Sequence, residues 1–165
     1  MREDREKLVQ LGFRVSDIDI AGKAPDQLEK EFAGVDIIFV AGGNTFYLLE
    51  KAKESGFDKL IKEMSKKDIV YIGSSAGSVI LAPDIEPSKY FDEREGTNLE
   101  NTEGLGLIDF VPLPHYGNEK SKELNDRVLA EYGGWKYKIV PMTDMQYRYV
   151  KENDVRLYDV SKLQT

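Results

Sequence analysis

Apolar residues follow two different spacings along the chain, and each spacing predicts a type of secondary structure. Within residues 57–64, apolar side chains recur at i, i+3, i+4 and i+7, which is typical of one buried helix face. Residues 35–40 and 69–72 are nearly continuous apolar runs, as in strands buried on both faces. The same criteria predict further helices over 2–11, 28–32, 46–52, 78–82 and 124–132 and further strands over 13–20, 107–111 and 137–140.

The order of these elements predicts the fold class. Strands that alternate with helices predict an α/β fold in three layers, with a mostly parallel sheet covered by helices on both faces. Residues 146–150 and 155–160 predict a C-terminal antiparallel hairpin. Residues 83–106, rich in proline, glycine and acidic side chains, predict a long loop, and such loops are more often functional than idle. No repeat or linker divides the chain, so we expect a single domain over residues 1–165.

Candidate chemistry is expected at the carboxyl ends of the strands, where sites of parallel sheets form. The sharpest candidate is Ser75 in the sequence Gly-Ser-Ser-Ala-Gly at residues 73–77, a G-x-S-x-G between an apolar strand and a helix. A serine on such a strained turn presents its hydroxyl as a nucleophile, and the next amide, that of Ala76, can donate to an oxyanion. The alternatives are a plain small-residue turn or an anion-binding loop at a helix start.

His115 follows another apolar strand and is the only histidine of the chain. Serine needs an adjacent base to become a good nucleophile, and histidine titrates in the useful range, so His115 is the candidate base. The alternative is a histidine that is simply packed or exposed. A third strand end, at residues 41–45, carries a glycine pair whose amides suit an oxyanion hole, with Gly43 as the candidate donor. In the plainer interpretation of the same turn, Asn44 or Thr45 caps the next helix.

A histidine base needs an acid to orient it. The candidate acids lie in the long loop and near two strands: Asp84, Glu86, Asp109 and Asp144. Only 50 residues follow His115 and 40 separate it from Ser75, so the chain order serine, histidine, acid fits best and favours Asp144. Asp84 and Glu86 remain open alternatives at this point.

Composition and charge exclude several other classes of site. The chain has no cysteine, which removes disulfides, thiolate catalysis and cysteine-ligated metals, and one histidine excludes a multi-histidine metal site. We expect no metal and no cofactor. The net charge of −7 makes nucleic acid and anionic membranes unsuitable partners, and no apolar run approaches the length of a membrane span. A cytosolic location is expected because residues 1–10 lack the apolar core of a signal peptide.

Together these segments resemble the peptidase E family of serine peptidases, the aspartyl dipeptidases, which includes cyanophycinase-like relatives. The resemblance is carried by residues 36–46, residues 73–78, the Pro114-His115 step and the Thr143-Asp144-x-Gln146 sequence, in matching order over roughly residues 1–160. It implies a fold similar to class I glutamine amidotransferases (flavodoxin-like), with Ser75 as nucleophile, His115 as base, Asp144 as the acid, and the Gly43 and Ala76 amides as the oxyanion hole. The implied reaction is cleavage of a peptide bond after an N-terminal aspartate.

Two departures from the family shape the expectations. Family members usually begin with about two more strand–helix units, so we expect either a missing N-terminal segment or another copy of the chain to complete the sheet. An aspartyl substrate also wants a cationic anchor, for which Arg127 and Arg94 are candidates, together with Asn44 as a substrate-binding residue. The sequence therefore predicts a peptidase of small peptides, with a non-catalytic binding or assembly module and a β-aspartyl hydrolase as alternatives.

Overall fold

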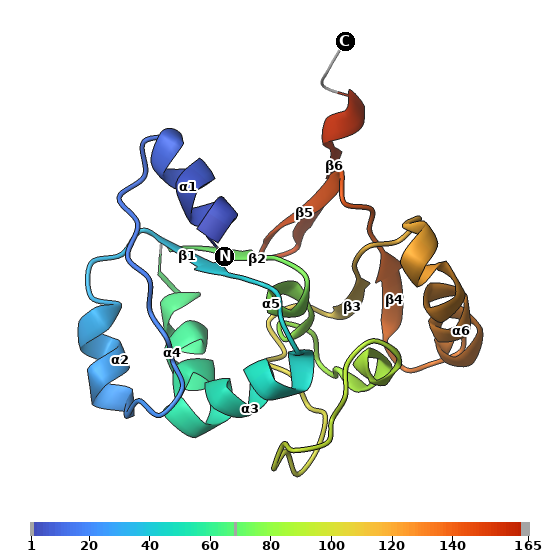
Figure 1. The fold of residues 1–165 in the computed structure, drawn as a ribbon, viewed down its shortest axis with the longest axis horizontal. Coiled ribbons are helices and arrows are strands. Elements are labelled where there is room, and N and C mark those ends of the chain that lie inside the picture. The colour runs from blue at the N-terminus through green and yellow to red at the C-terminus, as the bar shows by residue number, and fades with distance from the viewer. Residues whose placement is uncertain (1, 68, 163–165) are drawn as a thin grey trace.

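The computed structural model describes residues 2–67 and 69–162, which form a mixed α/β fold (Figure 1). The helices are α1 (Arg2–Gln10), α2 (Pro25–Glu31), α3 (Thr45–Ser55), α4 (Phe57–Met64), α5 (Ala76–Val79) and α6 (Lys122–Tyr132). The strands are β1 (Ile37–Val40), β2 (Val70–Gly73), β3 (Phe110–Leu113), β4 (Lys138–Pro141), β5 (Gln146–Lys151) and β6 (Asp154–Asp159). Short 3₁₀ helices span Glu86–Tyr90, Glu119–Ser121 and Val160–Lys162.

The first strand pair carries the larger core of the molecule. β1 and β2 are parallel, with Ile38 opposite Tyr71 on the face that meets the helices. Ile38, Phe46 and Ile61 are almost fully buried in this core, which unites β1 with α3 and α4. Figure 1 shows α2, α3 and α4 together on one side of this pair. Successive side chains of a strand point to opposite faces. Ile38 therefore points into the core, and its neighbours in β1 lie on the opposite face.

The second strand pair carries a smaller core. β3 and β4 are parallel, with Leu113 opposite Pro141. Leu113, Val128 and Tyr132 are buried together, so α6 packs against this pair (Figure 1). β3 begins and ends later than the predicted strand at 107–111 and contains Pro112. Proline has no N–H, and it is accommodated here because, among the described strands, β3 pairs with β4 alone.

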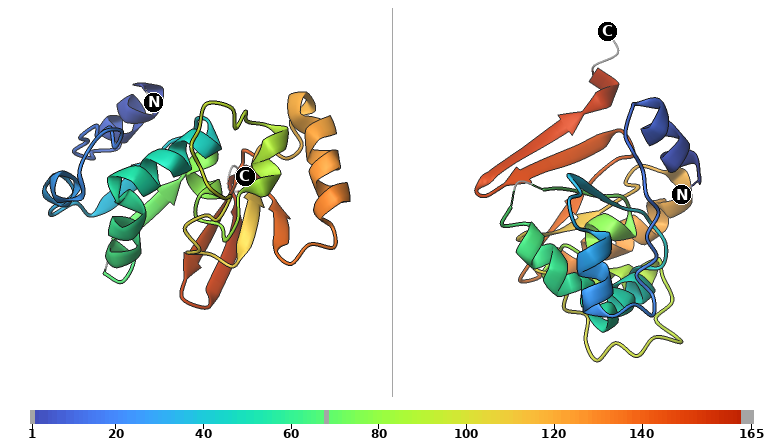
Figure 2. Two further views of the ribbon diagram at one scale, coloured as in Figure 1. Left: turned by 90° about the horizontal axis from the view of Figure 1, so that it is seen from below. Right: turned by 90° about the vertical axis from the view of Figure 1, so that its left-hand side faces the viewer.

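The predicted C-terminal hairpin is confirmed. β5 and β6 pair antiparallel from Gln146 opposite Asp159 to Lys151 opposite Asp154. The right-hand view of Figure 2 shows this hairpin extending away from the body of the molecule. Its side chains include a stacked pair of rings, Tyr147 and Tyr158, whose centroids are 4.9 Å apart.

Three further features of the predicted fold differ from the structure. Residues 13–20 form no strand, because their alternating pattern finds no neighbouring strand for a hydrogen-bonded ladder in the described chain. The described strands form three two-stranded sheets rather than one continuous sheet. Helices also fail to cover both faces of β1 and β2, whose outward side chains remain exposed: Ile37 at 37%, Phe39 at 36%, Val70 at 54% and Ile72 at 40%.

The long segment 83–106 contacts the rest of the molecule at several points. It contains the 3₁₀ helix Glu86–Tyr90 and an isolated β-bridge between Asp84 and Glu103. Leu105 is buried in the larger core, and its amide donates to the carbonyl of Ile80 at 2.8 Å. The predicted loop is therefore an ordered segment that packs beside α3 and α5.

Candidate active site

Ser75 lies on a tight turn between β2 and α5. Its backbone has φ 51° and ψ −120°, a conformation that side-chain-bearing residues rarely adopt. The turn presses against β1, since a Cβ added at Gly77 would lie 2.2 Å from the carbonyl oxygen of Val40. The Tyr71 hydroxyl donates to the Gly77 carbonyl at 2.8 Å, and burial raises the pKa of Tyr71, so the hydroxyl keeps its proton. The strained turn is thus held from two sides and presents the Ser75 side chain.

His115 lies just beyond β3 and also has a positive φ, 61°. Its carbonyl oxygen accepts from the Ser121 hydroxyl at 3.0 Å and from the Asn125 side-chain amide at 3.4 Å. The next residue, Tyr116, donates its amide to the carbonyl of Met142 at 3.0 Å. These contacts, from α6, from the 3₁₀ helix before it and from the residue that follows β4, fix the backbone that carries the imidazole.

The structure brings three predicted residues into one hydrogen-bonded row. Ser75 Oγ lies 3.0 Å from His115 Nε2, and His115 Nδ1 lies 2.7 Å from Asp144 Oδ1. A carboxylate can only accept, so this contact favours the tautomer with the proton on Nδ1, in which Nε2 can accept from the serine hydroxyl. The side chains of His115 and Asp144 are 49% and 58% exposed, so the row is open to solvent.

Two residues whose backbone amides are free in the described chain line the cavity beside the serine. Gly43, with φ 148°, and Ala76, the first residue of α5, both line the cavity that contains Ser75. Among the described residues, neither amide donates a hydrogen bond. The turn of Gly43 touches the serine turn directly, because a Cβ added at Gly42 would lie 3.1 Å from the Cβ of Ser75. Both residues are therefore candidates for an oxyanion hole beside the serine.

The other candidate acids are engaged elsewhere. Asp84 accepts the amide of Glu86 at 3.0 Å, and Glu86 accepts the hydroxyl of Tyr132 at 3.0 Å. Asp109 directly precedes β3, at the opposite end of the strand from His115. Asp144 is thus the carboxylate that meets the imidazole.

The three residues considered for substrate binding have other contacts. Asn44 caps α3, accepting the Tyr47 amide at 2.9 Å, as one of the two interpretations of that turn predicts. Arg127 pairs with Glu123 on its own helix at 2.8 Å, and Arg94 donates to the carbonyl of Leu99 at 2.6 Å. None of the three residues is among those that line the cavity at Ser75.

A cavity of about 210 Å³ opens beside Ser75 and His115. Its lining is mainly apolar, with a few hydroxyl groups: Gly43, Thr45, Ala76, Val79, Pro87, Ser88, Phe91, Asp92, Val111, Pro112, Leu113, Pro114 and Ser121 complete the wall. Among the residues that line it, the one carboxylate is that of Asp92, which lies in a run of charged residues within the long loop predicted over residues 83–106. Sequence reasoning missed Asp92, because nothing in the run separates it from its acidic neighbours.

Asp92 and its neighbour link the long loop to the oxyanion turn. Asp92 Oδ2 accepts the amide of Thr45 at 2.9 Å and its hydroxyl at 2.6 Å. The side-chain amide of Asn44 donates to the carbonyl of Glu93 at 2.8 Å. These three bonds hold the loop against the start of α3, next to Gly43.

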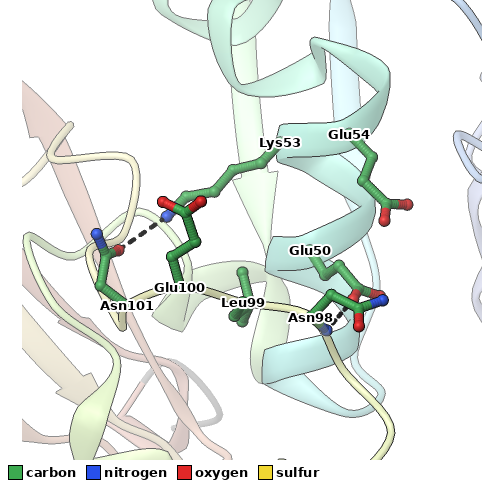
Figure 3. A pocket seen from close by; sticks show the side chains of 7 residues that line it. All are labelled: Glu50, Lys53, Glu54, Asn98, Leu99, Glu100 and Asn101. Carbon is green, nitrogen blue, oxygen red and sulfur yellow. Dashed lines mark hydrogen bonds between the residues drawn. The ribbon is translucent and has the colours of Figure 1, made fainter.

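A second cavity, of about 300 Å³, lies farther along α3 and contains none of these groups (Figure 3). There the buried carboxylate of Glu50 accepts the amide of Asn98, and Lys53 donates to Asn101 Oδ1 at 3.3 Å. The Asn98 amide is the main cause that lowers the pKa of Glu50, followed by the Lys51 ammonium. These contacts anchor the far end of the long loop.

Neither a metal cluster nor a membrane helix stands out in the described parts of the chain. Over residues 2–67 and 69–162, no group of three or more histidine, aspartate and glutamate side chains is placed to hold a metal ion. In the same residues, no helix has the length and apolar character needed to cross a bilayer.

Comparisons with known proteins give consistent matches. Residues 1–158 match the family described as peptidase family S51. An uncharacterized peptidase of Listeria monocytogenes is 37% identical over 152 residues, covering 92% of this chain and 74% of the relative. Peptidase E of Salmonella arizonae is 32% identical over 113 residues, so the match spans 68% of this chain and about half, 46%, of that relative. A crystal structure of a candidate peptidase E from Listeria monocytogenes superposes with a TM-score of 0.87 at 35% identity, covering 94% of this chain and 75% of that one.

Proposed function

Because this chain belongs to peptidase family S51, we propose that it is a serine peptidase that hydrolyses short peptides through an acyl-enzyme on Ser75. One observation carries the proposal: the 3.0 Å contact from Ser75 to His115, continued by the 2.7 Å contact from His115 to Asp144. A hydroxyl, an imidazole and a carboxylate in this order support the proposal, because acyl transfer needs a nucleophile, a base and an acid that orients the base.

In the first step, Ser75 Oγ forms a bond to the carbonyl carbon of the substrate and its proton passes to His115 Nε2. The negative charge that develops on the carbonyl oxygen is stabilised by the amides of Gly43 and Ala76. Asp144 stabilises the imidazolium that forms. The peptide C–N bond then breaks, and His115 returns the proton to the departing amine.

In the second step, water replaces the amine. His115 Nε2 takes a proton from the water as its oxygen bonds to the acyl carbon, and the ester bond to Ser75 breaks. The proton on His115 returns to the serine oxygen, which restores the starting state. The product is a peptide fragment or amino acid with a new carboxyl group.

The size of the cavity supports short substrates. About 210 Å³ is less than the ~300–1,000 Å³ usual for drug-sized ligands, so the cavity has room for the end of a peptide. Dipeptides that begin with aspartate are the reference substrates, because the family resemblance implies them. β-Aspartyl dipeptides test the alternative of a cyanophycinase-like hydrolase.

The test is hydrolysis of a dipeptide panel by the purified chain and by two matched variants. Ser75→Ala removes the nucleophile, whereas Ser74→Ala removes the exposed neighbouring hydroxyl from the same turn. We expect amine release by the wild type and by Ser74→Ala, and none by Ser75→Ala, with circular dichroism unchanged in all three. Hydrolysis that survives Ser75→Ala, or a wild type inactive on every peptide, would reject the proposal and favour a non-catalytic binding module.

A further inference from the structure

We propose that Asn125, a buried side chain of α6, is a positioning residue for the imidazole of His115. Asn125 is not among the residues that line the cavity at Ser75, so it acts through the backbone of His115. The inference rests on the function proposed above and deepens it, because it assigns a residue that keeps the base within reach of the serine.

The imidazole of His115 depends on its backbone for its direction. The side chain is 49% exposed, and the hydrogen bonds of its ring in the described chain are those to Ser75 and Asp144. The residue has φ 61°, a conformation that residues other than glycine hold only where their surroundings impose it. Because φ sets the direction of the Cα–Cβ bond, relaxation of this backbone would move Nε2 away from the serine hydroxyl.

Three donors converge on the carbonyl oxygen of His115. The backbone amide of Asn118 donates at 3.2 Å, the Ser121 hydroxyl at 3.0 Å and the Asn125 side-chain amide at 3.4 Å. Asn125 also donates to Ser121 Oγ at 3.2 Å, so the two side chains are linked to each other as well as to the carbonyl. A carbonyl oxygen can only accept, which places the NH₂ group of Asn125 toward His115. These bonds tie the strained backbone of His115 to the start of α6.

Packing alone does not account for an asparagine at position 125. Asn125, Val128 and Tyr132 lie on one buried face of α6, and Val128 and Tyr132 belong to the smaller core. Asn125 is 1% exposed, and its Oδ1 is buried without a hydrogen-bond partner in the described residues. A buried oxygen without a partner lowers stability, so an apolar side chain would suit this helix face better. The two donations are what the amide contributes here.

Ser121 shows the same preference for His115 over its own helix. It directly precedes α6, a position at which serine commonly accepts an amide of the first turn and so caps the helix. The Ser121 side chain makes no such cap, and its hydroxyl donates to the His115 carbonyl. Both side chains at the start of α6 therefore serve the backbone that carries the base.

The first experiment compares two variants on the same face of α6. Asn125→Leu replaces the amide by an apolar side chain of similar size. It should lower kcat for the best dipeptide about ten- to hundredfold, with KM within about twofold, because a small displacement of the base misaligns the proton transfer. Its melting temperature should equal or exceed that of the wild type, since the unpartnered oxygen is gone and leucine is the better helix former.

The matched control is Val128→Ala, which removes packing one turn farther along the helix. It should lower the melting temperature by about 3–8 °C while keeping kcat within about twofold of the wild type, measured below the unfolding transition. Ser121→Ala removes the second side-chain donor at a half-buried position, where a folding defect is not expected. It should lower kcat about two- to tenfold, again without a change in KM.

The second experiment observes the ring directly and needs no substrate. His115 is the only histidine of the chain, so its ¹⁵N-labelled ring nitrogens give unambiguous signals that report which nitrogen carries the proton. At a pH where the ring is neutral, we expect Nδ1 to be protonated in the wild type and in Val128→Ala. Asn125→Leu should show a mixture of the two tautomers, and Ser121→Ala should shift in the same direction.

The outcomes separate this inference from the proposed function. Unchanged kcat and unchanged nitrogen signals in Asn125→Leu and Ser121→Ala would overturn the positioning role. A loss of kcat in Asn125→Leu that follows only the fraction of unfolded protein would also overturn it, because a purely structural residue gives that result. Absence of any Ser75-dependent cleavage by the wild type would reject the proposed function, and the nitrogen signals would then decide whether Asn125 places the ring.

Discussion

Strands β1 and β2 contribute two surfaces that are built in opposite ways. At their carboxyl ends, turns place Ser75 and Gly43 against each other, and each turn is held by named contacts to other elements. On their outward face, Ile37, Phe39 and Val70 are 36% to 54% exposed, so the described chain covers them only in part. Several contacts therefore hold the backbone of the candidate site in place, whereas the outward face packs against little of the described chain.

Because of this difference, we expect substitutions in the two regions to affect activity and stability separately. The geometry of the proposed active site depends on turns and on a few polar contacts, so a change there should affect chemistry more than folding. The inward face of the same strands, with Ile38, holds the core and should affect folding more than chemistry. The outward face should affect neither, provided that it is exposed in solution.

The largest expected effect comes from removing the base. His115→Gln should lower kcat for peptide hydrolysis by about 10⁴–10⁶-fold. In a catalytic triad, loss of the base costs nearly as much activity as loss of all three residues. Val70→Thr, which changes the most exposed side chain of the outward face to one of similar shape, should change kcat less than about twofold. Steady-state assays of both variants check the contrast. Similar losses in the two variants would mean that the two surfaces are coupled.

A smaller effect is expected from the acid. Asp144→Asn should lower kcat by about 10²–10⁴-fold, because an amide holds the imidazole in the wrong tautomer. Solvent reaches this pair, since Asp144 is 58% exposed, and water can replace part of its contribution. The measurement is kcat on the best dipeptide. An unchanged kcat would contradict the role of Asp144 as the acid that orients His115.

The two faces of β1 can be compared directly by truncating neighbouring isoleucines. Ile38→Ala removes a side chain that is 5% exposed and should cost about 2–5 kcal/mol of unfolding free energy. Ile37→Ala removes one that is 37% exposed and should cost less than about 1 kcal/mol. Urea unfolding of the two variants measures the difference. Equal costs would show that the outward face is buried in solution, against a second copy or further polypeptide.

The smallest effect concerns the anchor of the long loop. The pKa of Glu50 is lowered below its ordinary 4.5, mainly by the Asn98 amide, so its ionised form stabilises the fold. This stabilisation is complete above pH 4.5 and is lost as the pH falls through the lowered pKa. The melting temperature of Glu50→Gln should therefore lie below that of the wild type at pH 7, and the gap should close in acid. Glu54→Gln, at a half-exposed position on the same helix, should show a smaller gap.

Sequence patterns could predict the candidate residues because each one lies in a recognisable short stretch of the chain. A serine between small residues at a strand end, and a sole histidine beside prolines, are visible in a single stretch each, and the structure brings Ser75, His115 and Asp144 within hydrogen-bond distance. Alternation also predicted the hairpin of β5 and β6, because both strands and their turn are contiguous.

What the sequence could not supply depends on contacts between distant segments. The alternating residues 13–20 have strand propensity, but a strand also needs a neighbour, and none lies beside them in the described chain. Asp92 differs from Glu93 and Glu95 only because the fold brings Thr45 to it. Arg127 and Arg94 were candidates by charge alone, and local partners occupy both.

The most direct test of the central claim is covalent labelling of the whole chain with a fluorophosphonate, followed by mapping of the adduct by peptide mass spectrometry. A serine activated by its neighbouring imidazole should react, so we predict one adduct, on Ser75, that disappears in Ser75→Ala and nearly disappears in His115→Gln. A folded wild-type chain that takes up no label, or carries it on Ser74 or elsewhere, would contradict the account.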